Sequence, residues 1–451
     1  MAIADVARAM ADANASAAVV STGVGHGIVT DADLRTKVVA AGRDPGAPVA
    51  EVATVPVTTI AADALAAEAL TRMVQGGFHH LLVLSTSGEV MGVVTETDVI
   101  GFGANSPFAI RSSIERAADA DAAVDAAARL RGSVAALVDG GVDAIHVGHV
   151  VGATVDTLTR RLLDLAFLEH GPPPVPWAWL AFGSLGRREQ ALHTDQDHGL
   201  AFDAAPGEEA GPRAYFGEVA GFVTQHLEDA GLPRCNGNIM ATNPRLRLSL
   251  LEWVDAFARW IRGEEDLVAG AASIVFDFRR VAGPLEVEPA LDRVVSASGK
   301  ERGFLRRLAL HALENKPPTG RIRDFLVEGS GAHEGTIDLK HGGIVPITDI
   351  ARLHMVEVGI SAHRTLDRLR LASAAGRVDE GTRRALEEAF RLLWQLRLDH
   401  QVVGVRASRD ADDFLDPRTL SPVTRQGLRE ALRVVAREQR ALRTGAVWTV
   451  T

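Results

Sequence analysis

The chain has 451 residues, with 48 basic and 58 acidic side chains, a net charge of −10, and 47% hydrophobic residues. At about 100–200 residues per domain, this length predicts two to four domains. The apolar fraction excludes an intrinsically disordered chain. The acidic excess argues against a protein whose main task is to bind nucleic acid, because affinity for phosphates comes from Lys and Arg.

Cysteine content and hydropathy indicate where such a chain resides. Its single cysteine, Cys235, has no partner for an internal disulfide, which fits a reducing compartment. No stretch approaches the ~18 apolar residues of a transmembrane helix. The chain opens directly into a helical pattern rather than into a secretory signal. We therefore expect a cytoplasmic protein that does not enter a membrane.

An internal repeat marks the N-terminal region. The segment GVGHGIVTDAD (residues 23–33) recurs as GEVMGVVTETD (residues 88–98). In each copy a predicted helix (4–13 and 65–75) is followed by a short apolar strand (17–20 and 81–84), a glycine turn, a second strand and T-x-x-D at a helix start. Each copy is thus a β-β-α unit. The second copy has an opening strand over 55–60 that the first copy lacks.

The pattern G-h-h-T-x-x-D resembles the CBS domain, whose tandem pairs bind adenosine nucleotides. The resemblance implies that Thr30 with Asp33, and Thr95 with Asp98, hold a ribose and its phosphates. A plainer interpretation is that each Thr caps a helix and each Asp favours the helix dipole. Both interpretations can hold together. CBS pairs often associate face to face, so a homodimer is expected.

Residues 105–172 are rich in alanine and charge, and they predict a helical connector with breaks at Gly132 and at 140–141. Asp143, His146 and His149 follow one another at spacings of three and could in principle ligate a metal. Because that spacing drifts around a helix, ordinary surface or packing positions are favoured. The segment GPPP (171–174) ends the helix and marks a domain boundary.

The stretch after this boundary carries the chemistry. A predicted strand, WAWLAF (177–182), ends in Gly183-Ser184, and a second predicted strand carries Asp195 and Asp197 on one face, their Cα atoms roughly 6–7 Å apart. Two carboxylates so placed can share Mg²⁺ or Mn²⁺. The glycine lets backbone approach the triphosphate of an NTP, and the hydroxyl of Ser184 and the charge of Arg187 bind its oxygens.

This arrangement resembles the polymerase-β nucleotidyltransferase superfamily. G-S-x-G-R-x-E with T-D-Q-D is similar, more closely, to a nucleotidyltransferase family that carries CBS pairs and is related to protein-PII uridylyltransferase. Such sites need a third carboxylate, for which Asp277 in a predicted strand over 274–279 is the candidate. The alternative for Asp277 is an ion pair with Arg279 or Arg280. Residues 235–245 also resemble the family and are expected to line the nucleotide cleft, without a chemical role for Cys235.

The last third of the chain predicts a helical domain. Its segment IDLKHGGIVPI (337–347) resembles the D-L-K-x-G-G motif of uridylyltransferase relatives, which implies that Lys340 meets the triphosphate from across the cleft. We expect an α/β multidomain chain: a tandem CBS pair (1–104), a helical connector (105–172), a polymerase-β-like nucleotidyltransferase domain (173–290) and an all-α substrate- and nucleotide-binding domain (291–451).

Two functions follow from these motifs. The first is a Mg²⁺-dependent nucleotidyltransferase that moves NMP from an NTP to an acceptor, with adenine nucleotide at the CBS pair as effector. The resemblance implies that the acceptor could be a hydroxyl of a regulatory protein. The second is a nucleotide-sensing module with a silent transferase-like domain. Because a silent domain need not keep its carboxylates, the intact Asp195 and Asp197 favour catalysis.

Overall fold

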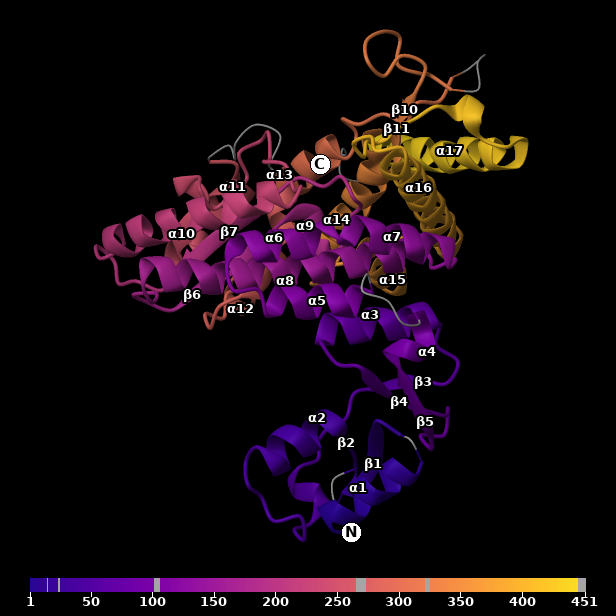
Figure 1. The fold of residues 1–451 in the computed structure, drawn as a ribbon. Helices are drawn as coiled ribbons and strands as arrows, with labels where there is room; N and C mark the ends of the chain where they lie inside the picture. The colour runs from indigo at the N-terminus through magenta and orange to yellow at the C-terminus, as the bar shows by residue number, and fades with distance from the viewer. Residues whose placement is uncertain (14, 23–24, 101–105, 265–272, 321–324, 445–451) are drawn as a thin grey trace. The chain divides into compact units, whose positions relative to one another are not determined.

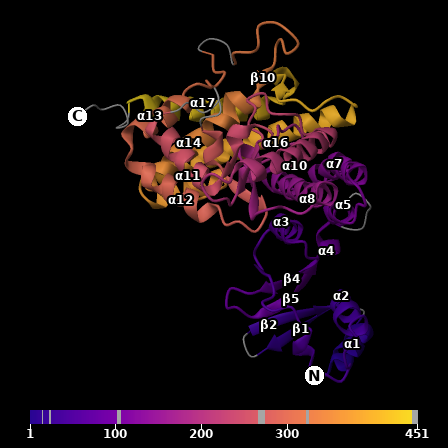
Figure 2. The same ribbon diagram turned by 90° about the vertical axis from the view of Figure 1, so that its left-hand side faces the viewer.

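The structure is a computed structural model of the chain, and it describes residues 1–13, 15–22, 25–100, 106–264, 273–320 and 325–444. The start of the first repeat copy, Gly23, lies outside these residues. The chain divides into two compact units, Met1–Phe108 and Ala109–Thr451, which are described separately (Figures 1 and 2). No helix of the described residues is long and apolar enough to cross a membrane.

The first unit contains the two repeat copies. Its helices are α1 (Ile3–Asp12), α2 (Asp31–Asp33), α3 (Ala66–Gly76) and α4 (Glu96–Ile100), with a π-helix over Leu34–Val39 and a 3-10 helix over Val49–Glu51. Its strands are β1 (Ala17–Thr22), β2 (Gly25–Thr30), β3 (Thr59–Ala61), β4 (His80–Leu84) and β5 (Val90–Thr95). The predicted helices and apolar strands of both copies are confirmed.

Pairing in the first unit follows the repeat. β1 is antiparallel to β2, and β4 is antiparallel to β5. The second copy alone has a further strand, β3, which lies parallel to β4. This strand is shorter than the predicted 55–60, because Pro56 has no N–H to donate to the ladder and pairing begins at Thr59. Ile3, Val6 and Val29 belong to the apolar core of the first copy.

The second unit begins within α5 (Pro107–Glu115). Its other helices are α6 (Ala120–Ala128), α7 (Leu130–Asp139), α8 (Ala144–His170), α9 (Gly183–Arg187), α10 (Ala210–Asp229), α11 (Leu250–Arg262), α12 (Glu288–Ala297), α13 (Arg302–His311), α14 (Val345–Val358), α15 (Thr365–Ala374), α16 (Glu380–Arg406) and α17 (Pro422–Thr444). Its strands are β6 (Trp177–Ala181), β7 (His198–Phe202), β8 (Arg247–Ser249), β9 (Arg279–Ala282), β10 (Ile337–Asp338) and β11 (Phe414–Leu415).

One sheet organises this unit, with strand order β8-β7-β6-β9. Side chains alternate along β6, so that Trp177 and Trp179 pack into a core with α6, α8 and α10. Ala178 and Leu180 point to the other face, into a core that includes residues of α11, α12, α13 and α14. Helices therefore cover both faces of the sheet, and the functional segments leave its edge at the strand ends.

The helices over 105–172 do more than connect. The helices are confirmed, but α6 and α8 form part of the core on one face of the sheet. The break between α6 and α7 falls at Arg129, and Gly132 lies inside α7, where a glycine costs only about 1 kcal/mol. The predicted break at Gly140-Gly141 is confirmed, with Gly141 at a φ of 74°.

Candidate active site

Asp195 and Asp197 lie in an extended segment just before β7, which begins at His198, so they are not within the strand itself. Gln196 between them is fully buried. Its backbone N–H donates to Pro233 O at 3.0 Å, and its Nε2 donates to Leu232 O at 2.8 Å. Because side chains alternate in extended backbone, anchoring Gln196 on one side directs both carboxylates to the other.

Asp197 has a perturbed carboxylate. The side chain is buried, and its Oδ1 has no hydrogen-bond partner within the described residues. Its pKa is raised to about 6, chiefly by burial and also by the negative charge of Asp195, while the Cys235 thiol and the positive charges of Lys340 and Arg187 act in the opposite direction. A bound cation would offset the repulsion between the two carboxylates and would give the buried Oδ1 a partner.

The Gly-Ser turn lies directly against Asp197. Phe182 N donates to Asp197 O at 2.8 Å, which places Gly183 beside the carboxylate. Gly183 has a φ of 53°, and an added Cβ would lie 3.1 Å from Asp197 Oδ2 and 2.8 Å from Ile274 Cγ2. Only glycine fits this position without strain. Ser184 follows at the start of α9, partly exposed, and its hydroxyl has no partner among the residues described.

Lys340, in the C-terminal helical region, acts electrostatically on Asp197. It begins a π-helical turn over Lys340–Ile344 that leads into α14. Its positive charge lowers the pKa of both Asp197 and Asp413. It forms no ion pair with any residue that the structure describes. Lys340 therefore lies within electrostatic range of Asp197, and its contact with a phosphate stays a prediction.

The glycine pair after Lys340 serves packing. A glycine pair can permit a close approach of backbone to a ligand. An added Cβ on Gly342 would instead lie 2.8 Å from Pro318 Cδ, and one on Gly343 would lie 2.8 Å from Leu393 Cδ1. The space beside both glycines is therefore filled by protein.

Arg187 occupies a different position from the expected one. It is buried, its Nε donates to Glu189 Oε2 at 2.8 Å, and its Nη1 donates to Asp277. Glu189 in turn accepts from Thr365 N at 2.6 Å. These ion pairs hold the Gly-Ser turn against α15. We therefore interpret Arg187 as a positioning residue and not as a ligand of the triphosphate.

The structure speaks against Asp277 as the third metal carboxylate. Residues Ile274–Phe276 form a 3-10 helix and not the predicted strand, and Asp277 caps it. Its carboxylate is fully buried and pairs with Arg187, Arg352 and Arg368. Despite burial, these charges hold its pKa well below the usual value. Both oxygens are therefore taken by guanidinium groups.

The alternative partners predicted for Asp277 were also wrong. Arg279 pairs with Asp156 at 2.8 Å, and Arg280 pairs with Glu286 at 2.7 Å. The true partners Arg352 and Arg368 lie on α14 and α15, so far along the chain that no local pattern connects them to Asp277.

A metal site in this unit has to use few protein ligands. Within the described residues no group of three or more His, Cys, Asp or Glu side chains is suited to hold a metal. Asp143 caps α8 by accepting from Ile145 N at 3.0 Å, which agrees with the non-metal interpretation of His146 and His149. Mg²⁺ is commonly held by one or two carboxylates with waters and substrate phosphates. Asp195 and Asp197, with the unpartnered Oδ1, fit that pattern.

A polar cluster on α16, which no sequence pattern predicted, holds the segment before Asp195. Arg397 Nη2 donates to His193 O at 3.0 Å, and Leu192 N donates to Gln401 Oε1 at 2.9 Å. Asp413 joins the two, accepting from Arg397 Nε at 2.6 Å and from Gln401 Nε2 at 2.8 Å. Arg397 and Gln401 are one helical turn apart, a spacing that in sequence resembles any long helix.

In the first unit, both T-x-x-D motifs form capping boxes. Thr30 Oγ1 donates to Asp33 Oδ2 at 2.7 Å, and Asp33 N donates back to Thr30 Oγ1 at 3.3 Å. Thr95 and Asp98 repeat both distances. The capping interpretation agrees with this geometry, and the nucleotide contacts stay a prediction. The copies differ in that Asp33 Oδ1 also pairs with Lys37 at 2.7 Å.

Comparison with known proteins agrees with these two units. Residues 128–266 match the family described as "Putative nucleotidyltransferase DUF294", and residues 302–445 match "Putative nucleotidyltransferase substrate binding domain". Residues 49–105 match the CBS domain. The matched residues include the second repeat copy, the segment with the carboxylates and the C-terminal helices.

Individual relatives cover shorter parts. An uncharacterized protein of Methanopyrus kandleri is 35% identical over 75 residues, which are 16% of this chain and 38% of the relative's own length. A solved structure, described as a putative signal-transduction protein with CBS domains from Burkholderia ambifaria, is 27% identical and covers 22% of this chain and 74% of that chain, with a TM-score of 0.21. On the three domain matches, the chain belongs to the family of proteins that carry a CBS domain, the domain described as "Putative nucleotidyltransferase DUF294" and the domain described as "Putative nucleotidyltransferase substrate binding domain".

Proposed function

We propose that the second unit transfers NMP from an NTP to an acceptor, with Mg²⁺ or Mn²⁺, and releases pyrophosphate. The observation that carries this proposal is the buried, unpartnered oxygen of Asp197, next to the charge of Asp195 and beside the Gly183-Ser184 turn. The family described as putative nucleotidyltransferase supports the class of reaction.

The two carboxylates would hold the metal. A bound divalent ion would neutralise charge on the phosphate oxygens and on the attacking and leaving oxygens of the displacement. Gln196, fixed by Pro233 and Leu232, keeps both carboxylates on one side of the extended segment. The arginine cluster around Asp277 is a support for the turn and holds no metal in this proposal.

The triphosphate would lie between two parts of the unit. Ser184, whose hydroxyl has no partner in the described residues, donates from the side of the turn. Lys340, which is without an ion pair there, supplies positive charge from the helical side. Gly183 brings the backbone of the turn close to Asp197 with no side chain between them. The sheet domain and the helical domain thus each contribute a phosphate ligand.

The reaction forms one bond and breaks one. An acceptor oxygen forms a bond to the α-phosphorus, the bond from that phosphorus to its bridging oxygen breaks, and pyrophosphate leaves with the electron pair. The acceptor proton passes to Asp195, the more exposed carboxylate of the pair. We propose a hydroxyl of a regulatory protein as the acceptor, which the family resemblance supports. We propose an adenine nucleotide at the CBS pair as the effector, which the CBS match supports.

A label-transfer assay tests the proposal. Full-length protein is incubated with α-labelled ATP, UTP, CTP or GTP, Mg²⁺ or Mn²⁺, and host-cell lysate. We expect label on a lysate component with the parent, and a loss of at least about 100-fold with Asp195→Asn or Asp197→Asn. Asp203→Asn, an exposed carboxylate just past the other end of β7, is the matched control and keeps parental activity.

The same assay distinguishes the transferase from the nucleotide-sensing module. If no nucleotide gives metal-dependent transfer or pyrophosphate release while adenine nucleotides still bind the first unit, the transferase proposal is wrong. The chain would then be a nucleotide-sensing module.

A further inference from the structure

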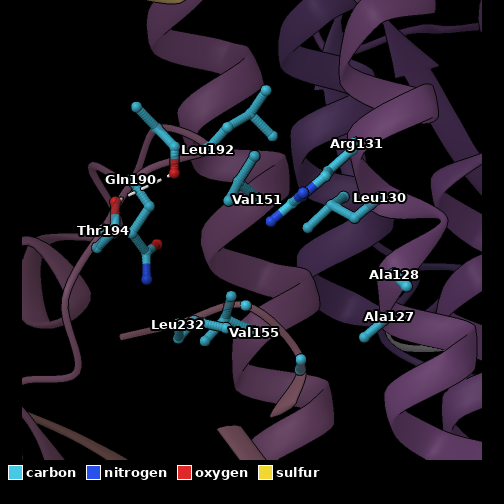
Figure 3. A pocket seen from close by; sticks show the side chains of 13 residues that line it. Ala127, Ala128, Leu130, Arg131, Val151, Val155, Gln190, Leu192, Thr194 and Leu232 are labelled. Carbon is cyan, nitrogen blue, oxygen red and sulfur yellow. Dashed lines mark hydrogen bonds between the residues drawn. The ribbon is translucent and has the colours of Figure 1, made fainter. Parts of the chain in front are cut away.

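A cavity lies behind the segment that leads to Asp195. It has a volume of ≈ 50 Å³ and is bounded by α6, α7, α8 and the segments 190–194 and 230–232. Most of its wall is apolar, with Val151, Val155, Leu192 and Leu232 among the lining side chains (Figure 3). None of the proposed metal or phosphate ligands lines it.

Three polar side chains break this apolar wall: Arg131, Gln190 and Thr194, whose hydroxyl donates to Ala191 O at 3.1 Å. Arg131 is exposed, and its guanidinium group extends toward the cavity in Figure 3. It forms no hydrogen bond or ion pair with the rest of the chain as far as the structure describes it. Gly231, with a φ of 93°, leaves the space for it, because an added Cβ would lie 3.0 Å from Arg131 Nη2.

Gln190 is the second polar group. The side chain is 1% exposed, and neither its Oε1 nor its Nε2 has a hydrogen-bond partner in the described part of the chain. Its Oε1 would lie 2.2 Å from a Cβ placed on Gly152, so the carboxamide is held close to α8. A buried amide without hydrogen-bond partners in the described residues is destabilising, and a ligand with polar atoms would offset this cost.

We propose that this cavity binds a small carboxylate with a short, branched hydrocarbon body. The unpaired guanidinium of Arg131 would bind the carboxylate, Gln190 would give a further hydrogen bond, and the apolar wall would enclose the hydrocarbon. At ~10–15 Å³ for each water, the cavity holds about four waters, which limits the ligand to about five to seven non-hydrogen atoms. Charge complementarity therefore selects an anion, and volume selects a compact one.

The position of the cavity connects its occupant with the transferase site. Leu192 and Thr194 line it and directly precede Asp195, and Leu232 lines it while its carbonyl accepts from Gln196. A ligand that packs against both segments would fix the extended segment that carries the carboxylates. This effect on turnover rests on the proposed function, whereas binding itself does not.

Calorimetric titration of the full chain with 2-methylpropanoate tests binding directly. We expect saturable binding by the parent and at least about tenfold weaker binding of the neutral 2-methylpropanamide. Arg131→Gln removes the guanidinium and should weaken the carboxylate at least about tenfold without changing the amide. Arg129→Gln, two residues away and not in the lining, is the matched control.

A second variant tests the apolar enclosure. Ala128→Leu adds bulk at an exposed lining position, so it should reduce binding of the carboxylate and the amide alike while leaving the melting temperature within about 2 °C. Equal binding of acid and amide, or an unchanged affinity in Arg131→Gln, would overturn the proposal. So would a lack of saturable binding by the folded parent to both 2-methylpropanoate and 3-methylbutanoate.

The activity measurement is separate. Label transfer with and without 2-methylpropanoate should change at least about twofold in the parent and remain constant in Arg131→Gln. If the ligand binds but no transfer occurs under any condition, the proposed function fails and the binding site stands. If transfer occurs but neither acid binds, the proposed function stands and the proposed binding site fails.

Discussion

Arg352 donates through Nε and Nη2 to the two carboxylate oxygens of Asp277, at 2.9 and 2.6 Å. This bidentate pair joins the segment before β9 to α14. Arg368 adds a further contact at 2.6 Å from α15, and Arg187 adds one from the Gly-Ser turn. One buried carboxylate thereby holds together the sheet, the turn and two helices of the second unit.

Removing this carboxylate should cost stability. Asp277→Asn would leave three buried guanidinium groups without their shared countercharge, and we expect a loss of about 3–5 kcal/mol in the free energy of unfolding. Urea unfolding measures it, with Asp203→Asn as the control of similar chemistry. A variant that unfolds like the parent but no longer binds Mn²⁺ would show instead that Asp277 is a metal ligand.

Lys340 offers a test of the phosphate contact. Because it forms no ion pair among the described residues, Lys340→Ala should leave the melting temperature nearly unchanged. The loss of its charge next to Asp197 should lower kcat/KM for the NTP by about 10- to 100-fold, mostly through KM. Lys340→Arg should restore part of this loss, and the exposed Lys300→Ala is the control. An unchanged KM in Lys340→Ala would remove Lys340 from the site.

The two CBS motifs should differ in how strongly they bind an adenine nucleotide. Asp33 Oδ1 is paired with Lys37, whereas Asp98 is exposed and, among the residues that the structure describes, forms hydrogen bonds within its capping box and no ion pair. We expect Asp98→Ala to weaken binding at least about tenfold and Asp33→Ala about twofold. Both variants lose the same capping box, so a similar stability cost of about 1 kcal/mol serves as the internal control. Equal weakening, measured by calorimetry, would contradict the ranking.

The sequence was informative wherever a local pattern carried the structure. The repeat, whose copies are 65 residues apart, predicted both β-β-α units, an apolar run predicted β6, and the Gly-Ser pair predicted the turn at Gly183. Lys340 was placed near the carboxylates because a motif resemblance identified it. Asp277 could not be interpreted in this way, because its three arginine partners lie on separate elements, and an apolar run around a single Asp is also typical of a strand.

Packing decided the other differences. The extended segment with Asp195 and Asp197 stays outside β7 because Gln196 bonds to Pro233 and Leu232 instead of to a strand of the sheet. The support from Arg397 and Asp413 joins positions that are distant in sequence from the segment they hold. Such long-range polar contacts have no spacing that a single sequence reveals.

His198 gives the unit a pH-dependent stability. It is fully buried beside the carboxylate segment, with Nδ1 accepting from Ala241 N at 3.0 Å and Nε2 3.1 Å from Gln196 Oε1. Burial lowers its pKa from 6.5 to about 3. Between these values the unfolded chain binds the proton and the folded chain does not, so stability is complete above pH 6.5 and falls as the pH decreases. The slope from this group is up to about 1.4 kcal/mol per pH unit.

Urea unfolding from pH 7.5 to 4.5 measures this slope. His198→Asn keeps an acceptor for Ala241 N but cannot take up the proton, so its unfolding free energy should start lower than that of the parent and decline less steeply below pH 6.5. His149, whose pKa burial also lowers, leaves a residual slope in the variant. Parallel curves for parent and variant would mean that His198 is protonated in the folded chain, and that the hydrogen bond from Ala241 N to its Nδ1 does not persist in solution.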